Sequence, residues 1–524
     1  TGTRGEMDIT TVFGTVIGGS NPSGCTNTME QKINKDLIPI EVTRVTSTLQ
    51  KSGYEAYIVG GCVRDLLMQR TPKDWDITTN ATPEIIQKLF EKTVYENKFG
   101  TVAVIFEGEV THETCRTIEV TPFRVEGSYS DHRHPDSVSF SEKIEDDLKR
   151  RDFTVNAIAF DPQKDTFIDV FNGIKDIKDK ILRAVGNPKD RFNEDALRIL
   201  RAVRFSTTLG FAIEGETLSA IALAAPLLAI VSKERIRDEF IKIIDSNDPS
   251  LGIALLAKLG LLEHTVPELA EGIGCEQKGE HIYDVFEHSL HALDHAAKKN
   301  LPLPIRLSAL FHDIGKPRTR RYDSLKAGGK GKYTFYGHEV VGAKMTKKIL
   351  ERLKFPSEIT NLVTTLVRYH MFFSDTETIS LSAVRRTIVN VGREHIWDLM
   401  QVRECDRVGM KKKEAPYRLR KYHAMIEEAL RAPTSVSILK INGDYMIKTL
   451  MMTPGRRMGW ILHALLEECL VDDTKNTLAY LSSRAKELNE LDDATLSNLG
   501  EKGRGKKEEA EKEELKKIRS KHGV

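Results

Sequence analysis

The sequence lacks the features of several common protein classes. Its six cysteines among 524 residues are widely spaced and form no CxxC pair, which argues against a zinc ribbon or a disulfide framework and is typical of the reducing cytoplasm. Its longest strongly apolar stretch, Ala220–Val231, is 12 residues long and contains Pro226, whereas a membrane-spanning helix needs about 20 residues. We therefore expect a soluble, cytoplasmic protein without a membrane partner.

An excess of charge of one sign is also lacking. The chain has 78 Lys and Arg residues against 76 Asp and Glu residues, so its formal net charge is only +2. The overall charge therefore does not indicate a nucleic-acid partner, and any basic surface must be local. Two stretches, Lys316–Lys332 and Lys411–Lys421, are rich in basic residues. Each is either a contact for RNA phosphates or a solvated loop.

Both ends of the chain have a biased composition. Residues 1–28 are rich in Gly, Thr and Ser and have neither the apolar core of a signal peptide nor the Arg-rich pattern of a transit peptide. We expect them to be disordered or a non-native extension, with Met29 as the natural start. Residues 496–524 are a charged low-complexity tail. Between these ends, the hydrophobic pattern predicts mixed α/β structure to about Asp169 and helices from Arg191 onwards.

Two carboxylates suggest a metal site in the α/β part. Asp74 and Asp76 lie two residues apart on a predicted strand over residues 74–78, so they share one face and repel each other unless a divalent cation lies between them. Upstream, Gly60 and Gly61 follow the apolar run 56–59 and precede a predicted helix.

A glycine turn at a helix start lets backbone N–H groups approach a phosphate, and Arg64 adds a positive charge one turn later. Together these features predict a site for a triphosphate and magnesium. Glu119, on a later predicted strand, is either a third catalytic carboxylate or an exposed strand residue.

Charged residues also recur along a predicted helix over residues 193–209. Asp195, Arg198, Arg201 and Arg204 follow each other every third residue, so each neighbours the next on the helix surface. On the residues alone, this stripe is either a solvated helix face or a binding surface.

Histidines cluster in the helical part. Seven of the 15 histidines lie between His281 and His370, around the doublet His312-Asp313. A lone histidine on an apolar helix is usually structural, but a cluster with a carboxylate suits a divalent transition metal.

Four motifs in order resemble one enzyme family. They are GGCVRD at 60–65, DWD at 74–76, RRDFTVNA at 150–157 and EDALR at 194–198. This series resembles the class II tRNA nucleotidyltransferases, the CCA-adding enzymes, to which the bacterial poly(A) polymerases are closely related. The resemblance implies an α/β polymerase-β-like head followed by all-α neck, body, HD and tail domains. The implied divisions are a head at 29–170, a neck and body at 171–275, an HD domain at 276–410 and a tRNA-binding tail at 411–495.

The resemblance also implies roles for single residues. Asp74 and Asp76 are expected to hold magnesium ions, with Glu119 as a further candidate catalytic residue. Asp195 and Arg198 are expected to pair with the edge of the incoming base, as a template made of protein. The complete set implied to bind the nucleotide is Gly60, Gly61, Arg64, Arg151, Asp152, Asn156, Asp195, Arg198, Arg201 and Arg204.

The histidine cluster resembles the HD-superfamily phosphohydrolases, whose pattern is H…HD…D. By that resemblance the metal ligands are His288, His312, Asp313 and Asp406, and His338 and His370 are candidates for a second metal. The expected metal is Mn²⁺, Ni²⁺, Co²⁺, iron or Mg²⁺. The alternative is a retained but inactive HD fold.

The resulting hypothesis is template-independent addition of CCA to the tRNA 3′ end and acceptor arm from CTP and ATP with two Mg²⁺ ions, without DNA as a partner. Alternatives are a poly(A) polymerase, an enzyme that adds only CC or only A, and a protein-uridylylating regulator with an HD domain. The intact carboxylate pair argues against a non-catalytic tRNA-binding protein.

Overall fold

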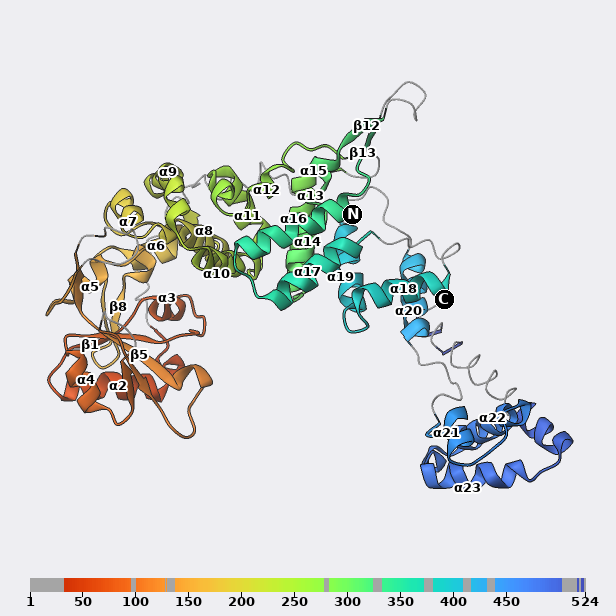
Figure 1. Cartoon of the computed structure of the whole chain (residues 1–524). Helices are drawn as coiled ribbons and strands as arrows, with labels where there is room; N and C mark the ends of the chain where they lie inside the picture. The colour runs from red at the N-terminus through yellow and green to blue at the C-terminus, as the bar shows by residue number, and fades with distance from the viewer. Residues whose placement is uncertain are drawn as a thin grey trace, which may run out of the picture. The chain divides into compact units, whose positions relative to one another are not determined.

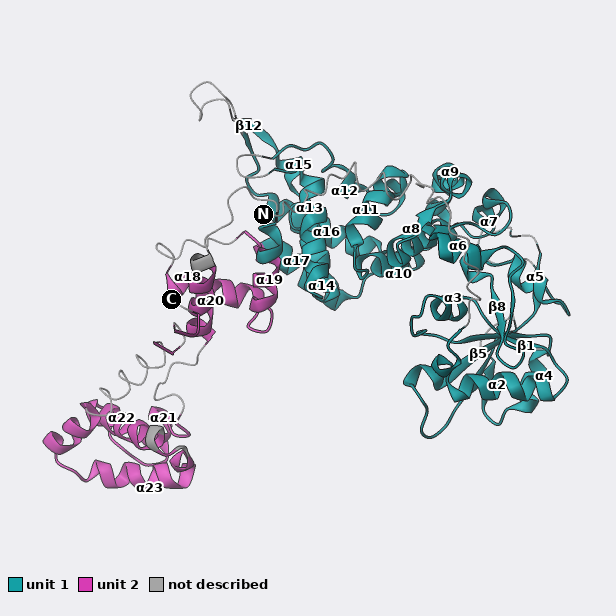
Figure 2. Cartoon of the chain, turned by 180° about the vertical axis from the view of Figure 1, so that it is seen from behind, with its two compact units in different colours: residues 1–368, 404–409 teal, residues 369–403, 410–524 magenta. Residues whose placement is uncertain are grey.

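The computed structural model describes residues 33–95, 100–127, 129, 137–277, 282–323, 332–371, 380–408, 416–430, 439–501, 516–517 and 520–522. The predicted extension 1–28, most of the tail 496–524 and much of both basic stretches lie outside these residues. The chain divides into two compact units, residues 1–368 with 404–409, and residues 369–403 with 410–524 (Figure 2). Within the described residues, no helix has both the length and the apolarity to cross a membrane.

The first unit contains a seven-stranded sheet in the order β3-β4-β5-β2-β1-β8-β9. Figure 1 labels β1, β5 and β8 of this sheet. Its only parallel pair among the described strands is β2 with β5. The strands are β1 (Ala56–Val59), β2 (Asp76–Thr79), β3 (Thr93–Tyr95), β4 (Val102–Ile105), β5 (Thr117–Pro122), β8 (Ala159–Asp161) and β9 (Thr166–Ile168). A separate hairpin pairs β6 (Arg124–Glu126) with β7 (Val138–Phe140).

Helices cover both faces of this sheet, because alternate strand residues point to opposite sides. Ile58 of β1 lies in the main core, while its neighbour Tyr57 packs in a second cluster with Leu148. The head helices are α2 (Ile40–Lys51), α3 (Gly61–Leu67), α4 (Pro83–Leu89), α5 (Ile144–Lys149) and α6 (Gly173–Asp179). The short strands β10 (Ile181–Leu182) and β11 (Ala212–Ile213) then pair in parallel at the start of the helical part.

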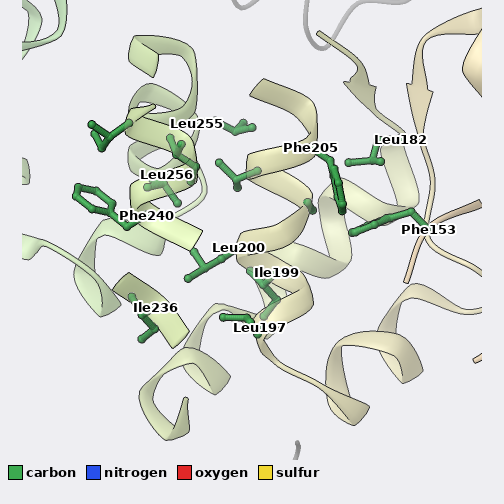
Figure 3. Close-up of a cluster of buried hydrophobic side chains, with 14 of the residues drawn as sticks. Phe153, Leu182, Leu197, Ile199, Leu200, Phe205, Ile236, Phe240, Leu255 and Leu256 are labelled. Carbon is green, nitrogen blue, oxygen red and sulfur yellow. The ribbon is translucent and has the colours of Figure 1, made fainter. Parts of the chain in front are cut away.

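The helix α8 (Leu197–Leu209) joins the head to the helices that follow. Figure 3 shows Phe205 lying beside Phe153 of the head, while Leu200 faces Phe240. The rings of Phe153 and Phe205 meet edge to face with centroids 5.8 Å apart. The surrounding helices are α7 (Pro188–Glu194), α9 (Gly215–Ala224), α10 (Lys233–Ile244), α11 (Pro249–Lys258) and α12 (Pro267–Ala270). The same hydrophobic core continues from the head through these helices as far as Val367.

The rest of the first unit carries the histidine cluster. Its elements are α13 (Val285–Lys298), α14 (Leu303–Phe311), α15 (Lys316–Thr319), β12 (Arg321–Asp323), β13 (Lys332–Thr334), α16 (His338–Arg352) and α17 (Ser357–Tyr369), the last of whose residues falls in the second unit. The end of α19 (Ile396–Asp406) also belongs to the first unit. Arg306 of α14 ties these helices to α10 by donating to the backbone carbonyls of Ile244 and Ser246.

The second unit is helical and has a core of its own. Its further helices are α18 (Leu381–Val391), α20 (Pro416–Leu430), α21 (Gly443–Lys448), α22 (Arg456–Val471) and α23 (Leu478–Asn489). Ile461, Leu465 and Leu481 are fully buried in the core that α21, α22 and α23 share.

Two predicted elements differ from the observed ones. The helix predicted over residues 193–209 breaks at Asp195, whose backbone is extended (φ −136°, ψ 103°). The Asp195 carboxylate accepts a hydrogen bond from the Leu197 N–H, so it satisfies a free donor at the start of α8. The strand predicted from residue 74 begins at Asp76, and Asp74 lies in the bend that precedes it.

Candidate nucleotide and metal sites

The candidate catalytic carboxylates gather at the β2–β5 pair. The parallel register places Asp76 opposite Glu119, while Trp75 is buried in the core. Asp74 and Glu119 are exposed and Asp76 is half-buried. Burial raises the pKa of Asp76, and the charge of Asp74 raises it further, against the lowering effect of Arg151. Asp74 and Asp76 therefore interact, although the prediction that both lie on one strand was wrong.

A guanidinium lies against the glycine turn that adjoins this carboxylate pair. Gly60 has a φ of +86°, and a Cβ atom there would lie 2.7 Å from Nη1 of Arg151 and 3.7 Å from Oδ2 of Asp76. Arg151 is also held by Asp147, with Nη2 3.1 Å from Oδ2. The absent side chain of Gly60 thus leaves room for the Arg151 guanidinium beside the turn.

A buried hydrogen-bond network runs from the turn to α8. Arg64 donates from Nη1 to Oδ1 of Asn156 at 2.6 Å, and Asn156 donates from Nδ2 to Oδ1 of Asp152 at 3.0 Å. Arg201 of α8 donates from Nε to the other oxygen of Asp152 at 2.8 Å. Burial opposes ionisation of Asp152, but Arg201 and Asn156 hold its pKa well below the usual range. Asp152 is therefore a carboxylate at neutral pH.

Asp195 and Arg198, the residues predicted to act as a template, line a pocket of about 260 Å³ between the head and the helices that follow it. Its walls are formed by Arg150, Arg151, Asp152, Asp195, Leu197, Arg198, Arg201 and Arg235. Arg198 donates from Nη1 to Oε2 of Glu194 at 2.9 Å and from Nη2 to the backbone carbonyl of Arg150, also at 2.9 Å. Side chains predicted from separate motifs thus meet in one place.

Arg235 is a pocket residue that sequence reasoning missed. It lies on α10 and donates from Nη2 to Oδ2 of Asp195 at 2.8 Å, so it fixes the carboxylate predicted to select the base. The only signal was a basic run at residues 233–237, which does not distinguish an exposed helix face from a pocket wall.

Arg204 follows Arg201 on α8, and both guanidiniums lie over the Phe205 ring, that of Arg201 at 5.4 Å from the ring centroid. The Arg204 guanidinium lies 3.9 Å from the Phe205 ring centroid, and its Nε is 2.9 Å from Oε2 of Glu239. Burial lowers the pKa of Arg204 to about 10. The prediction of one continuous helical stripe was therefore wrong at its first residue, because Asp195 precedes α8, while Arg198, Arg201 and Arg204 all lie on this helix.

The histidine cluster brings four predicted ligands together. One ligand atom from each of His288, His312, Asp313 and Asp406 lies within 4.8 Å of the others, and all four residues are buried. Nε2 of His288 is 3.2 Å from Nε2 of His312 and 3.3 Å from Oδ1 of Asp406. Nδ1 of His312 lies 2.8 Å from the carbonyl of Ala309, which directs Nε2 into the cluster. Imidazole and carboxylate donors in this arrangement suit a divalent metal.

The charges of the cluster agree with a cation site. Burial alone would lower the pKa of His312, but Asp313 and Asp406 raise it to about 10. Burial likewise opposes ionisation of Asp313, yet His312 and Lys316 hold its pKa well below the usual range. Nζ of Lys316 lies 2.6 Å from Oδ2 of Asp313, so this lysine, predicted as a candidate RNA contact, faces the cluster instead.

The two candidate ligands for a second metal, His338 and His370, belong to different units of the chain. Nε2 of His338 lies 3.3 Å from Oδ1 of Asp313, at the edge of the cluster. His370 is buried and belongs to the second unit, and its role stays a prediction.

Three family models match the chain in sequence order. They are the Poly A polymerase head domain over residues 56–183, the probable RNA and SrmB-binding site of polymerase A over residues 210–273, and the HD domain over residues 285–414. The residues of the seven-stranded sheet are therefore similar to the Poly A polymerase head domain, and those of the histidine cluster are similar to the HD domain. The predicted fold class is confirmed.

Curated relatives of this chain are named CCA-adding enzymes. The CCA-adding enzymes of Lactobacillus helveticus (strain DPC 4571) and Geobacillus kaustophilus (strain HTA426) are 47% and 48% identical over 214 and 223 residues, which cover 40% and 42% of this chain. The same alignments cover 52% and 53% of those relatives, so the chain spans about half the length of the curated relatives it matches.

The fold is also similar to that of the Bacillus stearothermophilus CCA-adding enzyme in its crystal structure with CTP. The TM-score is 0.55 at 27% identity, over 86% of this chain and 97% of that chain. The resemblance to CCA-adding enzymes predicted from the motifs is confirmed.

We expect Gly60→Ala to destabilise the head more than Gly53→Ala. Both glycines have positive φ, +86° and +89°, so each alanine costs about 1–3 kcal/mol in backbone strain. Only at Gly60 would the new Cβ displace Arg151, which adds about 1 kcal/mol or more. Urea unfolding followed by Trp75 fluorescence, with Trp397 and Trp460 replaced by Phe, measures the difference. Equal losses would contradict the assigned contact.

Proposed function

We propose that this chain adds the CCA sequence to the 3′ end of tRNA, with CTP and ATP as substrates. The observation that carries the proposal is the pocket that Asp195, Arg198 and Arg151 line together, because Arg151 also lies against the glycine turn that adjoins Asp76. The predicted base-reading residues and the carboxylate pair therefore have one arginine in common, whose charge lowers the pKa of Asp76. The identity to proteins named CCA-adding enzymes supports the same activity. Five described cysteines are buried as free thiols, which agrees with work in the cytoplasm.

In the proposed reaction the 3′-hydroxyl oxygen of the tRNA attacks the α-phosphorus of the nucleotide. The new phosphodiester bond forms as the bond to pyrophosphate breaks, and the hydroxyl proton passes to solvent. Asp74 and Asp76 would hold Mg²⁺, with Glu119 beside them. When bound, Mg²⁺ supplies charge neutralisation for the triphosphate and acidifies the attacking hydroxyl.

The side chains of the pocket would then divide the work of binding. Arg151 and Arg64 provide guanidinium groups for the phosphates, and Asp195 and Arg198 offer an acceptor and donors to the edge of the base. Arg198 now donates to Glu194 and to a backbone carbonyl, so it must exchange part of these bonds for the base. Arg235 acts as a positioning residue, because it holds the Asp195 carboxylate.

Replacing Asp76 by Asn should reduce incorporation of labelled CTP into tRNA without CCA by more than about 100-fold, because a metal ligand is lost. Asp74→Asn should behave alike, whereas the exposed Asp36→Asn should not change the rate. Thermal unfolding should show that Asp76→Asn keeps its fold, since burial disfavours the charged carboxyl. Near-normal incorporation by either site variant would refute the carboxylate assignment.

Arg198→Ala should alter which nucleotide is added more than how tightly nucleotides bind. Each lost base-edge pair removes about 1–3 kcal/mol of discrimination, or roughly tenfold to a hundredfold. The matched variant Arg64→Ala should weaken all nucleotides alike, since its expected partner is phosphate. Values of kcat/KM for CTP, ATP, UTP and GTP measure both effects. They also distinguish CCA addition from poly(A), CC-only or A-only addition. One common factor for all four nucleotides in Arg198→Ala would exclude a template role.

A second candidate function is metal-dependent phosphoester hydrolysis by the HD domain, favoured by the four buried ligands that converge there. In this reaction the oxygen of a water molecule adds to phosphorus, the ester P–O bond breaks, and the alcohol leaves with a proton. His288, His312, Asp313 and Asp406 would hold the metal, which supplies an acidified water when bound. Lys316 holds Asp313 in place.

Variants of this second site should separate the two activities. His312→Ala and Asp313→Ala should lose Mn²⁺ binding, measured by calorimetry, and hydrolysis of nucleoside 2′,3′-cyclic phosphates or simple phosphomonoesters. Both should keep nucleotide addition, and exposed His112→Ala should keep all three properties. Absence of hydrolysis by the unaltered protein with Mn²⁺, Ni²⁺, Co²⁺ and Mg²⁺ would make the HD domain structural.

A further inference from the structure

A small hairpin beside the HD cluster presents aromatic and cationic groups. β12 and β13 pair antiparallel with Tyr322 opposite Tyr333, and the two rings meet edge to face with centroids 5.3 Å apart. The Arg320 guanidinium also packs against this pair, 3.7 Å from the Tyr333 ring centroid. Tyr322 is 62% exposed. Tyr322 is thus an exposed aromatic side chain that packs against Tyr333, which in turn packs against Arg320.

Both ends of the hairpin are anchored in the metal cluster. The first end follows α15, whose Lys316 lies 2.6 Å from Asp313. The second end leads through Phe335, whose backbone carbonyl lies 2.8 Å from Nδ1 of His338, to the helix α16. Tyr333 is five residues from His338, so the two Cα atoms are at most about 17 Å apart. Only short segments of chain therefore join the aromatic pair to the cluster.

The hairpin has little need of this tyrosine for its own stability. Tyr322 is largely exposed, so it contributes little buried apolar area. Exposed aromatic rings and guanidinium planes are the surfaces on which unpaired nucleobases stack. Arg320 and the exposed Arg321 add positive charge for a phosphate. Aromatic rings and cations on one short segment thus complement a nucleotide.

We propose that Tyr322, Tyr333 and Arg320 form a nucleobase-stacking platform, which makes nucleotide phosphoesters the substrates of the HD site. The inference rests on the proposed hydrolytic function of that site. The platform is separate from the Asp195–Arg198 pocket and uses stacking instead of base-edge pairing. It holds any base of an unpaired nucleotide, such as the last nucleotide of an RNA, because every base has a face that can stack.

A matched pair of substrates tests the platform. Adenosine 3′-phosphate and 1-O-methylribose 3-phosphate carry the same ester and differ only in the base. With the full chain and Mn²⁺, Tyr322→Ala should lower kcat/KM for adenosine 3′-phosphate about tenfold and leave the base-free ester unchanged. Arg320→Ala should act in the same direction. Tyr322→Phe, which keeps the ring, should retain the preference, and Tyr95→Ala, an exposed tyrosine of the head, should have no effect.

Two results would overturn the platform: an equal fall for both esters in Tyr322→Ala, or no fall for either. If the unaltered protein hydrolyses neither ester, the hydrolytic function fails, and equilibrium dialysis then decides on the platform alone. An adenosine 3′-phosphate Kd about tenfold weaker in Tyr322→Ala than in the unaltered protein supports the platform. An unchanged Kd overturns it.

Discussion

The candidate nucleotide site depends on the hydrogen bonds that the buried carboxylate of Asp152 accepts. One of its oxygens accepts from Asn156, which holds Arg64, and the other accepts from Arg201 of α8. Head and neck are therefore joined by charge-assisted hydrogen bonds as well as by the edge-to-face contact of Phe153 and Phe205. Removal of one partner would leave a buried charge unpaired, which is far more costly than the loss of a surface ion pair.

The HD cluster also contains buried charged groups, but its side chains differ from those around Asp152. It places two carboxylates and two imidazoles in a buried space, where Lys316 lies 2.6 Å from the carboxylate of Asp313. Both sites are thus built from opposite charges that are removed from water and held by hydrogen bonds. The candidate nucleotide pocket has a volume of about 260 Å³, whereas the candidate ligand atoms of the HD cluster all lie within 4.8 Å of one another, as the ligands of a single ion do.

Much of the architecture follows from local patterns in the sequence. The motif order predicted a mixed α/β head and helical domains, and the doublet His312-Asp313 predicted a cluster that the structure brings together. Side-chain partners between distant elements were not predictable. Arg235 lies 40 residues from Asp195, and no periodicity relates a helix face to a pocket wall that another element forms. The break at Asp195 was missed because helical spacing continues across it, although its carboxylate caps the next helix.

The spacing of the HD ligands along the chain has a consequence for folding. His288 and Asp406 are 118 residues apart in sequence, yet their side chains lie 3.3 Å from each other. An ion bound by both would close a loop of that length and act as a reversible cross-link, analogous in entropy to a disulfide. The concentration of free metal would then affect the stability of the folded chain as well as the proposed hydrolytic activity of the HD domain.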